Sequence, residues 1–390
     1  MIMKAEKWLH QIDSGNLNTI LAALYGANSV RNQKERYKTC ILQHKNHFDP
    51  ASIMLFSTPG RTELGGNHTD HNHGRVLAAS VQLDSLAVAA PSSSSVVEII
   101  SEGYTEKISV DLGKLERVRE EEGKTESLVR GIAARLHSLG YKTGGFKAYI
   151  QSNVLRGSGL SSSASIEVLL GTIFNHLFND GTIDILRIAQ VGQYAENNYF
   201  GKPCGLMDQV ACGCGGIVVI DFEDLDNPSV GQLFFNFEDK GYALAVVDTG
   251  GSHENLTPEY ASIPDEMKSV AREMGREFLR GIPTNELISR IPKVRSWVGD
   301  RAVLRCLHFI LENDRVIEQV EALREDRIED YLKLVRASGD SSWKLLQNSN
   351  SPRNPREQGL SLALALTEIF LNGKGACRVH GGGFAGTIQV

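Results

Sequence analysis

The sequence of 390 residues lacks the features that mark several classes of protein. No apolar run approaches the ~20 residues that a membrane helix requires. The first residues, MIMKAEKWLHQIDSGN, lack the apolar core of a secretory signal. No long basic run is present, and 41 Lys and Arg against 47 Asp and Glu give a net charge of −6. We therefore expect a cytoplasmic protein that binds neither membranes nor nucleic acids.

Cysteine is scarce as well, with six residues and no C-x-x-C pair. This usage favours reduced thiols and gives no support to a zinc site or a disulfide framework. Hydrophobic residues make up 41% and charged residues 23%, which is ordinary for a globular protein. A chain of this length can build a full core, and it suggests two domains.

Helical and strand-like patterns are mixed along the chain without strict β-α-β alternation, which predicts an α+β fold. Residues 1–50 look helical, and helical spacing returns at residues 128–139, 166–174 and 184–199. Residues 76–90 alternate apolar and polar side chains, as a half-buried strand does. We place the domain boundary near residue 225, which gives an N-terminal domain of residues 1–225 and a C-terminal domain of residues 226–390.

A segment rich in glycine and serine directly precedes the helical pattern at residues 166–174. Its residues are Gly157, Ser158, Gly159, Leu160, Ser161, Ser162 and Ser163. Small residues let backbone N–H groups approach an anion closely, and the start of the helix adds its positive end. The segment therefore predicts a phosphate-binding loop, with a plain serine-capped helix start as the alternative.

Two other glycine motifs are incomplete. The Gly-Lys-Thr sequence at residues 123–125 lacks the leading glycine of a Walker A loop. The segment at residues 381–386 fits G-x-G-x-x-G, but only four residues follow it. No βα unit fits into so short a remainder, so the dinucleotide-binding interpretation fails.

Two carboxylates are candidates for chemistry. Glu196 lies on the apolar stripe of the helical pattern at residues 184–199. A carboxylate on a buried face is costly unless a cation pairs with it. Either a Mg²⁺ ion or an Arg or Lys side chain fits that requirement, unless the stripe itself is wrongly assigned. Asp208 follows Gly205 and precedes small residues, so a ligand could approach it closely, although such an aspartate is more often a helix cap.

A polar cluster follows Arg61. It contains Asn67, His68, Asp70, His71 and His73. The cluster could hold a metal ion, but adjacent residues do not easily converge on one ion. Binding the hydroxyl groups of a polar ligand suits Asn, His and Asp better.

Three separated motifs, PGR with GNHTD, then GSGLSSSAS, then GGGF, occur in an order typical of one superfamily. Together they resemble the GHMP small-molecule kinases, and within that superfamily the galactokinases. The segments AENNYFGKPCGLMDQ and DTGGSHENLTPEY extend the resemblance to about residues 20–390. It implies two domains of mixed sheets and helices, with the active site in the cleft between them. It also implies ATP-dependent phosphorylation of a sugar, most closely galactose, at its anomeric hydroxyl.

The resemblance also implies residue roles. Asp208 is expected as the catalytic aspartate that faces the anomeric hydroxyl, and Arg61 is expected to orient it and to stabilise charge. The loop from Gly157 to Ser163 would bind the phosphates of ATP, and Ser163 and Glu196 would bind Mg²⁺. The residues expected to line the sugar pocket are Asn67, His68, Thr69, Asp70, Gly205 and Tyr260. Residues 381–384 would form a glycine loop that supports the active site.

The sequence departs from the family at several points. The family pattern GRVNLIGEHTDY reads GRTELGGNHTDH here. Asn67 replaces a glutamate that contacts sugar hydroxyls, and His71 replaces a tyrosine. Losing one charged hydrogen bond typically costs ~1.5–3 kcal/mol, so we expect weaker galactose binding or a preference for another sugar. The chain stops at Val390, where family members continue, so we expect a C-terminal domain that is short at its end.

Three alternatives stay open. The first is a GHMP kinase for another sugar or a small alcohol. The second is a non-catalytic sensor that binds sugar and ATP, and the third is a metal hydrolase that uses the histidine cluster. We expect a monomer. The kinase interpretation requires the serine-rich loop, Glu196, Asp208 and Arg61 to converge on one site.

Overall fold

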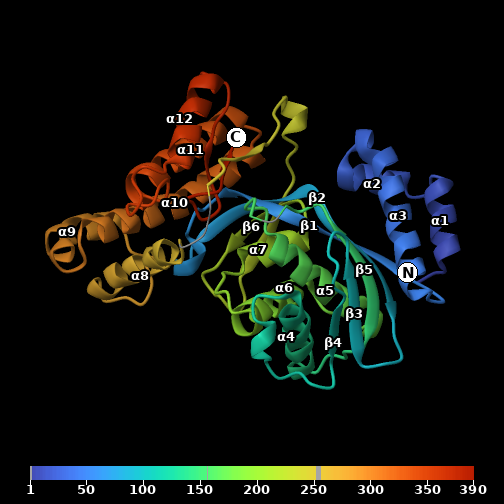
Figure 1. Ribbon diagram of the computed structural model, residues 1–390. Helices are drawn as coiled ribbons and strands as arrows, with labels where there is room; N and C mark the ends of the chain where they lie inside the picture. Colours follow the sequence, from blue (N-terminus) through green and yellow to red (C-terminus); the bar gives the residue numbers. More distant parts are fainter. Residues whose placement is uncertain (1, 156, 252–255) are drawn as a thin grey trace. The chain divides into compact units, whose positions relative to one another are not determined.

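The computed structural model describes residues 2–155, 157–251 and 256–390 (Figure 1). The chain folds into two compact units. Unit 1 comprises Met1–Gly60, Val81–Leu155 and Ser161–Cys214, and unit 2 comprises Arg61–Ser80, Arg156–Leu160 and Gly215–Val390. The single boundary expected near residue 225 does not describe this division, because two early segments belong to unit 2. They pack there against residues from the end of the chain.

The sheet of unit 1 is mixed. Its strands are β3 (Val96–Ser101), β4 (Ile108–Asp111), β5 (Phe146–Ser152) and the last part of β2 (Arg75–Pro91). β5 pairs antiparallel with β2, with Val88 opposite Tyr149, and parallel with β3. β3 in turn pairs antiparallel with β4. The strand β1 (Met54–Gly65) pairs with β2.

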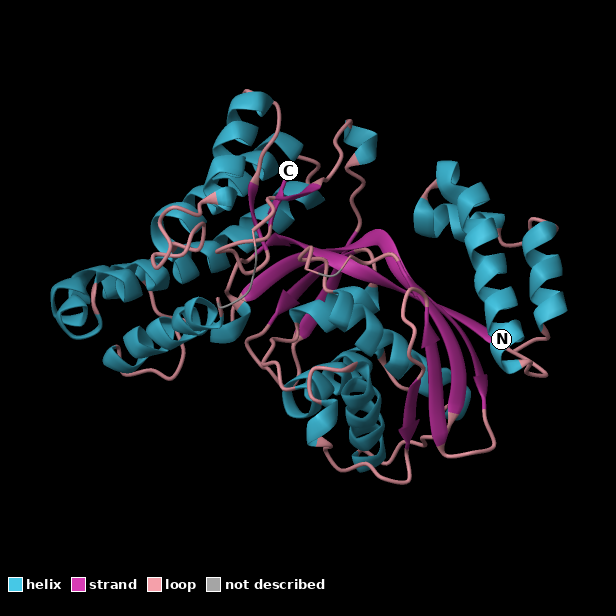
Figure 2. Ribbon diagram, viewed as in Figure 1, coloured by secondary structure: helices cyan, strands magenta, loops and turns pink. Residues whose placement is uncertain are grey.

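Helices cover both faces of this sheet (Figure 2). One layer is α1 (Ala5–Asp13), α2 (Asn18–Tyr25) and α3 (Val30–Phe48). The other layer is α4 (Thr125–Ser138), α5 (Ser162–Phe178), α6 (Ile185–Ala195) and α7 (Met207–Cys214). Successive side chains of a strand point to opposite faces. Accordingly Leu86 and Val88 pack in the cluster of the first layer, and Ala87 and Ala89 pack in that of the second.

This arrangement corrects one expectation about β2. The alternating pattern at residues 76–90 predicts a half-buried strand, yet residues 84–90 are all buried. The reason is that the N-terminal helices cover the face which would otherwise meet water. A buried network fixes them there, because Asp84 on β2 accepts hydrogen bonds from Tyr25 at 2.6 Å and from Arg36 at 2.5 Å.

Unit 2 combines two small groups of strands with a set of helices. The first part of β2 pairs antiparallel with β6 (Ile217–Asp221), which pairs with β7 (Ser229–Leu233). A second sheet has the order β8 (Val246–Asp248), β10 (Thr387–Gln389), β9 (Arg378–His380), and all its pairs are antiparallel. The helices are α8 (Thr257–Glu273), α9 (Thr284–Val298), α10 (Asp300–Arg324), α11 (Ile328–Ser341) and α12 (Gly359–Leu371).

The core of unit 2 forms around α10. Its apolar side chains pack with those of α8 and α9 on one side and with β2, β6 and α11 on another. The mixture of helices with antiparallel and parallel strand pairs confirms the α+β prediction, as do the helices in residues 1–50. Among the described residues, no helix is long and apolar enough to cross a membrane.

Candidate active site

The serine-rich part of the predicted phosphate loop belongs to unit 1 and lies at the start of α5. Ser161 precedes the helix with left-handed backbone angles (φ 58°, ψ 56°), and Ser162 and Ser163 form its first turn. The Ser161 hydroxyl donates a hydrogen bond to Asp208 Oδ2 at 2.5 Å. Asp208 lies in the first turn of α7. Within unit 1, therefore, the positive end of α5 and the predicted catalytic carboxylate are direct neighbours.

Glu196 begins a π-helical turn, Glu196–Phe200, that continues α6. Such turns interrupt a regular helix and occur often at functional sites. The carboxylate is almost completely buried. Its Oε1 lies 3.3 Å from Lys202 Nζ, and its Oε2 accepts a hydrogen bond from Gln209 Nε2 at 3.1 Å. The buried carboxylate of Glu196 thus has the cationic partner that was one of the alternatives predicted from the sequence, and this partner is Lys202.

A second buried carboxylate, Glu167, lies beside this group. It follows Ser163 by one helical turn on α5, and Gln209 Nε2 donates to its Oε2 at 2.8 Å. Burial, and secondarily the charge of Glu196, raise the pKa of Glu167 well above its usual range. Glu167 Oε1 has no hydrogen-bond partner among the residues that the structure describes.

This donor set is compatible with Mg²⁺. The ion prefers hard oxygen ligands, takes few of them from the protein and keeps several waters. Unit 1 offers a carboxylate held by an exposed ammonium group, a buried carboxylate oxygen without a partner among the described residues, and the hydroxyl of Ser163 on the same helix. Neither Glu167 nor Gln209 was predicted from the sequence. The available signal was a glutamate placed among the apolar residues of the helical pattern at residues 166–174.

The glycine part of the loop belongs to unit 2, together with Arg61. The Arg61 guanidinium donates to the carbonyl of Gly159, and the Arg61 N–H donates to the carbonyl of Leu160 at 3.0 Å. Thr387 Oγ1 donates to the carbonyl of Ser158 at 3.2 Å. A Cβ atom at Gly159 would lie 2.9 Å from His380 Nδ1, so only glycine fits this position. Arg61 thus holds the backbone of the predicted phosphate loop.

Three residues predicted for the sugar pocket form hydrogen bonds to the C-terminal glycine loop, residues 381–384. Asn67 Nδ2 donates to the carbonyl of Gly381 at 2.8 Å, and His68 Nε2 donates to that of Gly382 at 3.0 Å. The Tyr260 hydroxyl donates to the carbonyl of Gly383 at 2.8 Å. A Cβ atom at Gly382 would lie 2.5 Å from the Tyr260 ring, so the loop requires glycine there. This loop is therefore positioned by the predicted sugar-binding residues.

Asn67 is 1% exposed, and both the N–H donors and the oxygen of its amide have partners inside unit 2. Besides Gly381, its Nδ2 contacts Glu63 Oε1 at 3.1 Å, and its Oδ1 accepts from Asn348 at 2.9 Å. Glu63 in turn forms a buried ion pair with Arg378. Glu63, Asn348 and Arg378 were not predicted from the sequence, because Glu63 pairs with Arg378 and Asn348 with Asn67 across 315 and 281 positions of the chain.

The other residues predicted for the sugar pocket, Thr69, Asp70 and Gly205, differ in burial and in their hydrogen bonds. Thr69 is buried, and its hydroxyl bonds to the carbonyls of Gly66 and Arg75, so it holds a turn. Asp70 is half-buried and accepts from the His71 N–H at 3.0 Å. Gly205, in unit 1, is half-buried just before α7. Burial lowers the pKa of His68 to about 3 and raises the pKa of Tyr260 to about 12, so neither carries charge at neutral pH.

The histidine cluster does not gather around a metal ion. No group of three His, Cys, Asp or Glu side chains suited to a metal occurs in residues 2–155, 157–251 and 256–390. His68 bonds to the glycine loop, while His73 bonds to the carbonyl of Glu223 at 3.0 Å and packs on Phe278. These contacts give the metal-hydrolase alternative no support.

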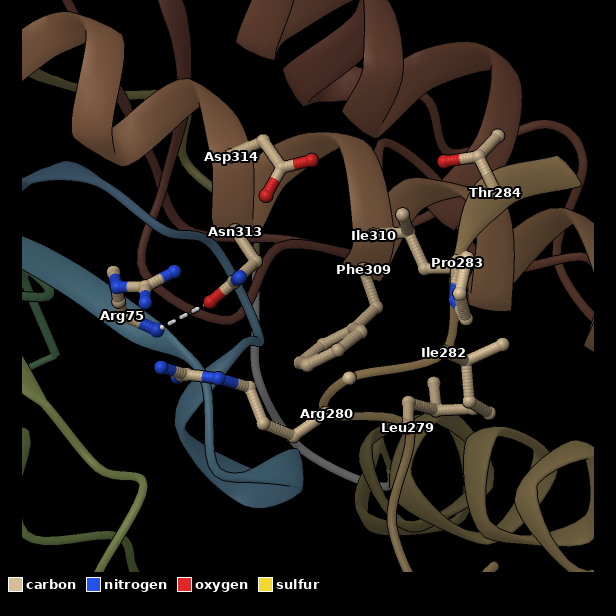
Figure 3. A pocket seen from close by; sticks show the side chains of 11 residues that line it. Arg75, Leu279, Arg280, Ile282, Pro283, Thr284, Phe309, Ile310, Asn313 and Asp314 are labelled. Atoms are coloured by element: carbon tan, nitrogen blue, oxygen red, sulfur yellow. Dashed lines mark hydrogen bonds between the residues drawn. The ribbon is translucent and has the colours of Figure 1, made fainter. Parts of the chain in front are cut away.

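A cavity of about 300 Å³ lies in unit 2 near the start of β2 (Figure 3). Arg75, Arg280 and Asn313 line its polar side, and Asn313 Oδ1 accepts from the Arg75 N–H at 2.9 Å. Both guanidinium groups bond to the Asp221 carboxylate, and Arg280 also pairs with Glu223 at 3.5 Å, so two carboxylates face the two cations. None of the residues predicted for catalysis or binding lines this cavity.

Comparison with known proteins supports the resemblance that the motifs indicated. Residues 127–216 match the family described as GHMP kinases N terminal domain, and residues 42–91 match the galactokinase galactose-binding signature. The chain is thus similar to the GHMP kinases, and among them to the galactokinases.

Individual relatives give the same result. The galactokinase of Glaesserella parasuis is 29% identical over 351 residues, which cover 89% of this chain and 87% of that protein. The galactokinase of Clostridium tetani is 25% identical over 336 residues, covering 85% of this chain and 78% of that protein.

Solved structures confirm the α+β fold of this chain. The galactokinase of Lactococcus lactis, solved with galactose, superposes with a TM-score of 0.74 at 23% identity and covers 96% of this chain and 88% of its own. The mevalonate kinase of Methanococcus jannaschii gives a TM-score of 0.59 at 18% identity, covering 86% of this chain and 90% of its own. A shared fold supports different acceptors, so the acceptor has to be argued from the residues.

Proposed function

We propose that this GHMP kinase transfers the terminal phosphoryl group of ATP to the anomeric hydroxyl of galactose, producing galactose 1-phosphate and ADP. The observation that carries the proposal is the hydrogen bond from Ser161 to Asp208. It joins the loop predicted for phosphate to the carboxylate predicted for the acceptor hydroxyl. Phosphoryl transfer depends on such positioning and on charge stabilisation more than on covalent chemistry.

The roles of the residues follow from their chemistry. Asp208 accepts a hydrogen bond from the attacking hydroxyl and takes its proton as the new O–P bond forms and the bond to ADP breaks. The start of α5, with Ser161 to Ser163, binds phosphate oxygens through N–H and O–H groups. Arg61 contributes positive charge and holds the loop carbonyls. Glu196 and Ser163 would hold Mg²⁺, which neutralises phosphate charge when it is bound.

The galactose-binding signature over residues 42–91 supports a sugar-binding role for residues 67–70. Gly205 and Tyr260 lie outside this signature. For Tyr260, the support is its hydrogen bond to the same glycine loop that Asn67 and His68 contact. We expect the sugar to contact His68, Asp70 and Tyr260. Asn67 would act through the loop, because it is buried and both of its amide donors are engaged.

The occupied amide of Asn67 also favours a second candidate, a kinase for another hexose. Asn67 carries no charge, both N–H donors of its amide are engaged, and the residue is only 1% exposed to a sugar hydroxyl. A hexose that needs no contact at this position would then be accepted as well as galactose, or better. The acceptor panel in the following test separates these two candidates.

The experiment is a turnover assay of the full chain with Mg-ATP and a panel of hexoses, measured as sugar-dependent ADP release. Release with galactose, and identification of the product as a 1-phosphate, is the expected result. Asp208→Asn should lower turnover on the order of 10²-fold or more, because a charged group that acts in the transition state is lost. Binding of ATP and sugar without any turnover would reject the catalytic proposal and leave a sensor.

A further inference from the structure

The two carboxylate oxygens of Glu196 lie in different surroundings. Oε2 accepts a hydrogen bond from Gln209 Nε2, a side chain that is 0% exposed. Oε1 lies 3.3 Å from Nζ of Lys202, whose side chain is 63% exposed. One oxygen is therefore held by a buried amide group, and the other by an ammonium group that reaches solvent.

The buried amide is itself held firmly. An amide NH₂ group has two donors, and Gln209 directs them to Glu196 Oε2 at 3.1 Å and to Glu167 Oε2 at 2.8 Å. α6 passes close by, because a Cβ atom at Gly192 would lie 3.0 Å from Glu167 Cβ and 3.5 Å from Gln209 Cγ. α5, α6 and α7 thus pack closely around this group, and the Gln209 side chain is completely buried between them.

Lys202 is held far more loosely. It lies in the loop that follows the π-helical turn and precedes α7. Within the part of the chain that the structure describes, Glu196 is the one carboxylate that its ammonium group contacts. Ion pairs with one exposed partner are weak, since water and salt screen them. A divalent cation that binds Oε1 therefore competes with a weakly held lysine, while the Cys204 thiol also lies beside the Glu196 carboxylate.

We infer that Glu196 offers Oε1 to the metal ion, that Gln209, itself anchored by Glu167, holds Oε2 in place, and that Lys202 is a counter-ion which the metal displaces. Gln209 and Glu167 are then positioning residues for the metal ligand. The inference rests on the proposed kinase function only for the nature of the ion. It adds to that function that the Lys202 ammonium group balances the charge of the buried Glu196 carboxylate until the metal binds.

The test is a titration of the full chain with Mn²⁺ alone, in which free Mn²⁺ is counted by electron paramagnetic resonance. Lys202→Met removes the competing charge, so the Kd for Mn²⁺ should fall about two- to fivefold. Gln209→Met removes the donor to Oε2 and should raise the Kd roughly tenfold or more, the effect of a lost hydrogen bond to a charged group. The two variants thus shift the Kd in opposite directions.

Matched controls exclude general effects. Lys38→Met removes an exposed lysine that pairs with Asp13 at 3.0 Å, and it should leave the Kd unchanged. Lys202→Arg keeps the charge and should also leave it near the wild-type value. Asn175→Leu removes another buried amide from α5, so it destabilises unit 1 without touching the metal ligand. Its Kd should stay unchanged.

The Mn²⁺ affinity of the lysine variants decides whether Lys202 competes with the metal ion. Weaker Mn²⁺ binding in Lys202→Met, or no change in it, overturns the inference. If Gln209→Met does not fold, the lysine variants still decide, because Lys202 is exposed. In turnover assays, the Mg²⁺ concentration for half-maximal rate should shift with the Mn²⁺ Kd while the KM for the sugar stays constant. Because the titration needs neither sugar nor turnover, a failed kinase assay leaves this test intact.

Discussion

The side-chain amide of Asn67 donates a hydrogen bond to the carbonyl oxygen of Gly381 at 2.8 Å, although 314 positions separate the two residues in the sequence. His68 makes the same kind of bond to Gly382, and Tyr260 to Gly383. Three successive carbonyls of the glycine loop are thus held by three side chains that the sequence predicts for the sugar pocket. A change in one of these side chains is therefore transmitted to the loop.

The contact between Asn67 and Glu63 leads to the first prediction, on the variant Asn67→Glu. Asn67 Nδ2 lies 3.1 Å from Glu63 Oε1, and both residues are buried. The substitution replaces a hydrogen-bond donor with a second carboxylate, and two such groups cannot both stay ionised at this distance. We expect the free energy of unfolding to fall by about 3–5 kcal/mol, as for other uncompensated buried charges. Urea unfolding followed by circular dichroism measures it.

The double variant Glu63→Asn/Asn67→Glu is the control. It restores one amide and one carboxylate at these two positions, which is also the order in the family pattern GRVNLIGEHTDY. The two substitutions should therefore be non-additive, with a favourable coupling of about 2 kcal/mol or more in a double-mutant cycle. Strictly additive effects would contradict the prediction. Galactose turnover by the double variant then tests the pocket assignment without the loss of stability that the single variant carries.

The local patterns of the sequence were sufficient to predict much of unit 1. The helix from Ser162 and the loop before it follow from apolar spacing and small residues, and both are present. The burial of Glu196 with a cationic partner was one of the alternatives, and Lys202 is that partner. Such features are readable because the residues involved are close together in the chain.

The supporting groups could not be predicted, because their partners lie far away in sequence. Glu63 pairs with Arg378, and Asn67 with Asn348, across 315 and 281 positions. Nothing in the local pattern distinguishes these residues from solvent-exposed polar ones. The same limit explains why the segment at residues 61–80 was not assigned to unit 2.

The backbone of Ser161 leads to a second prediction. Its left-handed conformation is unfavourable for a residue with a Cβ atom, by roughly 1–2 kcal/mol, and its hydroxyl bonds to Asp208. Ser161→Ala and Ser161→Gly both remove the hydroxyl, so we expect the same loss of turnover from both. Glycine also removes the strain, so Ser161→Gly should be more stable than Ser161→Ala by about 1 kcal/mol. Thermal unfolding and steady-state kinetics test this, and an active Ser161→Gly would exclude a role for the hydroxyl.

The Arg36–Asp84 ion pair, which fixes α3 to β2, leads to a third prediction. Both side chains are buried, and the other groups that bond to the Asp84 carboxylate are the uncharged hydroxyls of Tyr25 and Ser57. Arg36→Met should lower the free energy of unfolding by about 3–5 kcal/mol, because it leaves a buried carboxylate without its counter-charge. Arg36→Met/Asp84→Asn should recover part of that loss. Lys38→Met, on the exposed side of the same helix, should leave the unfolding midpoint unchanged.

His308 on α10 makes the stability of this protein dependent on pH. It is fully buried, its Nε2 donates to the carbonyl of Asn67 at 2.9 Å, and its Nδ1 is 2.8 Å from the Ser341 hydroxyl. A carbonyl can only accept a hydrogen bond, so Nε2 carries a proton, while the Ser341 hydroxyl can donate to a neutral Nδ1. Burial lowers the pKa of His308 below its usual value of 6.5, against the opposing charge of Glu312.

A lowered histidine pKa means that, as the pH falls, the unfolded chain takes up a proton before the folded chain does. The stability that His308 contributes is therefore complete above the unfolded pKa of about 6.5 and is lost as the pH falls through the lowered pKa of the folded state. His308→Gln should reduce the difference between the unfolding free energies at pH 7 and pH 5, by at most about 1.4 kcal/mol per pH unit for one proton. Urea unfolding at the two pH values measures this difference. His10→Gln, at an exposed position of α1, should leave the difference unchanged, and equal differences in wild type and His308→Gln would show that His308 takes up its proton equally readily in the folded and the unfolded chain.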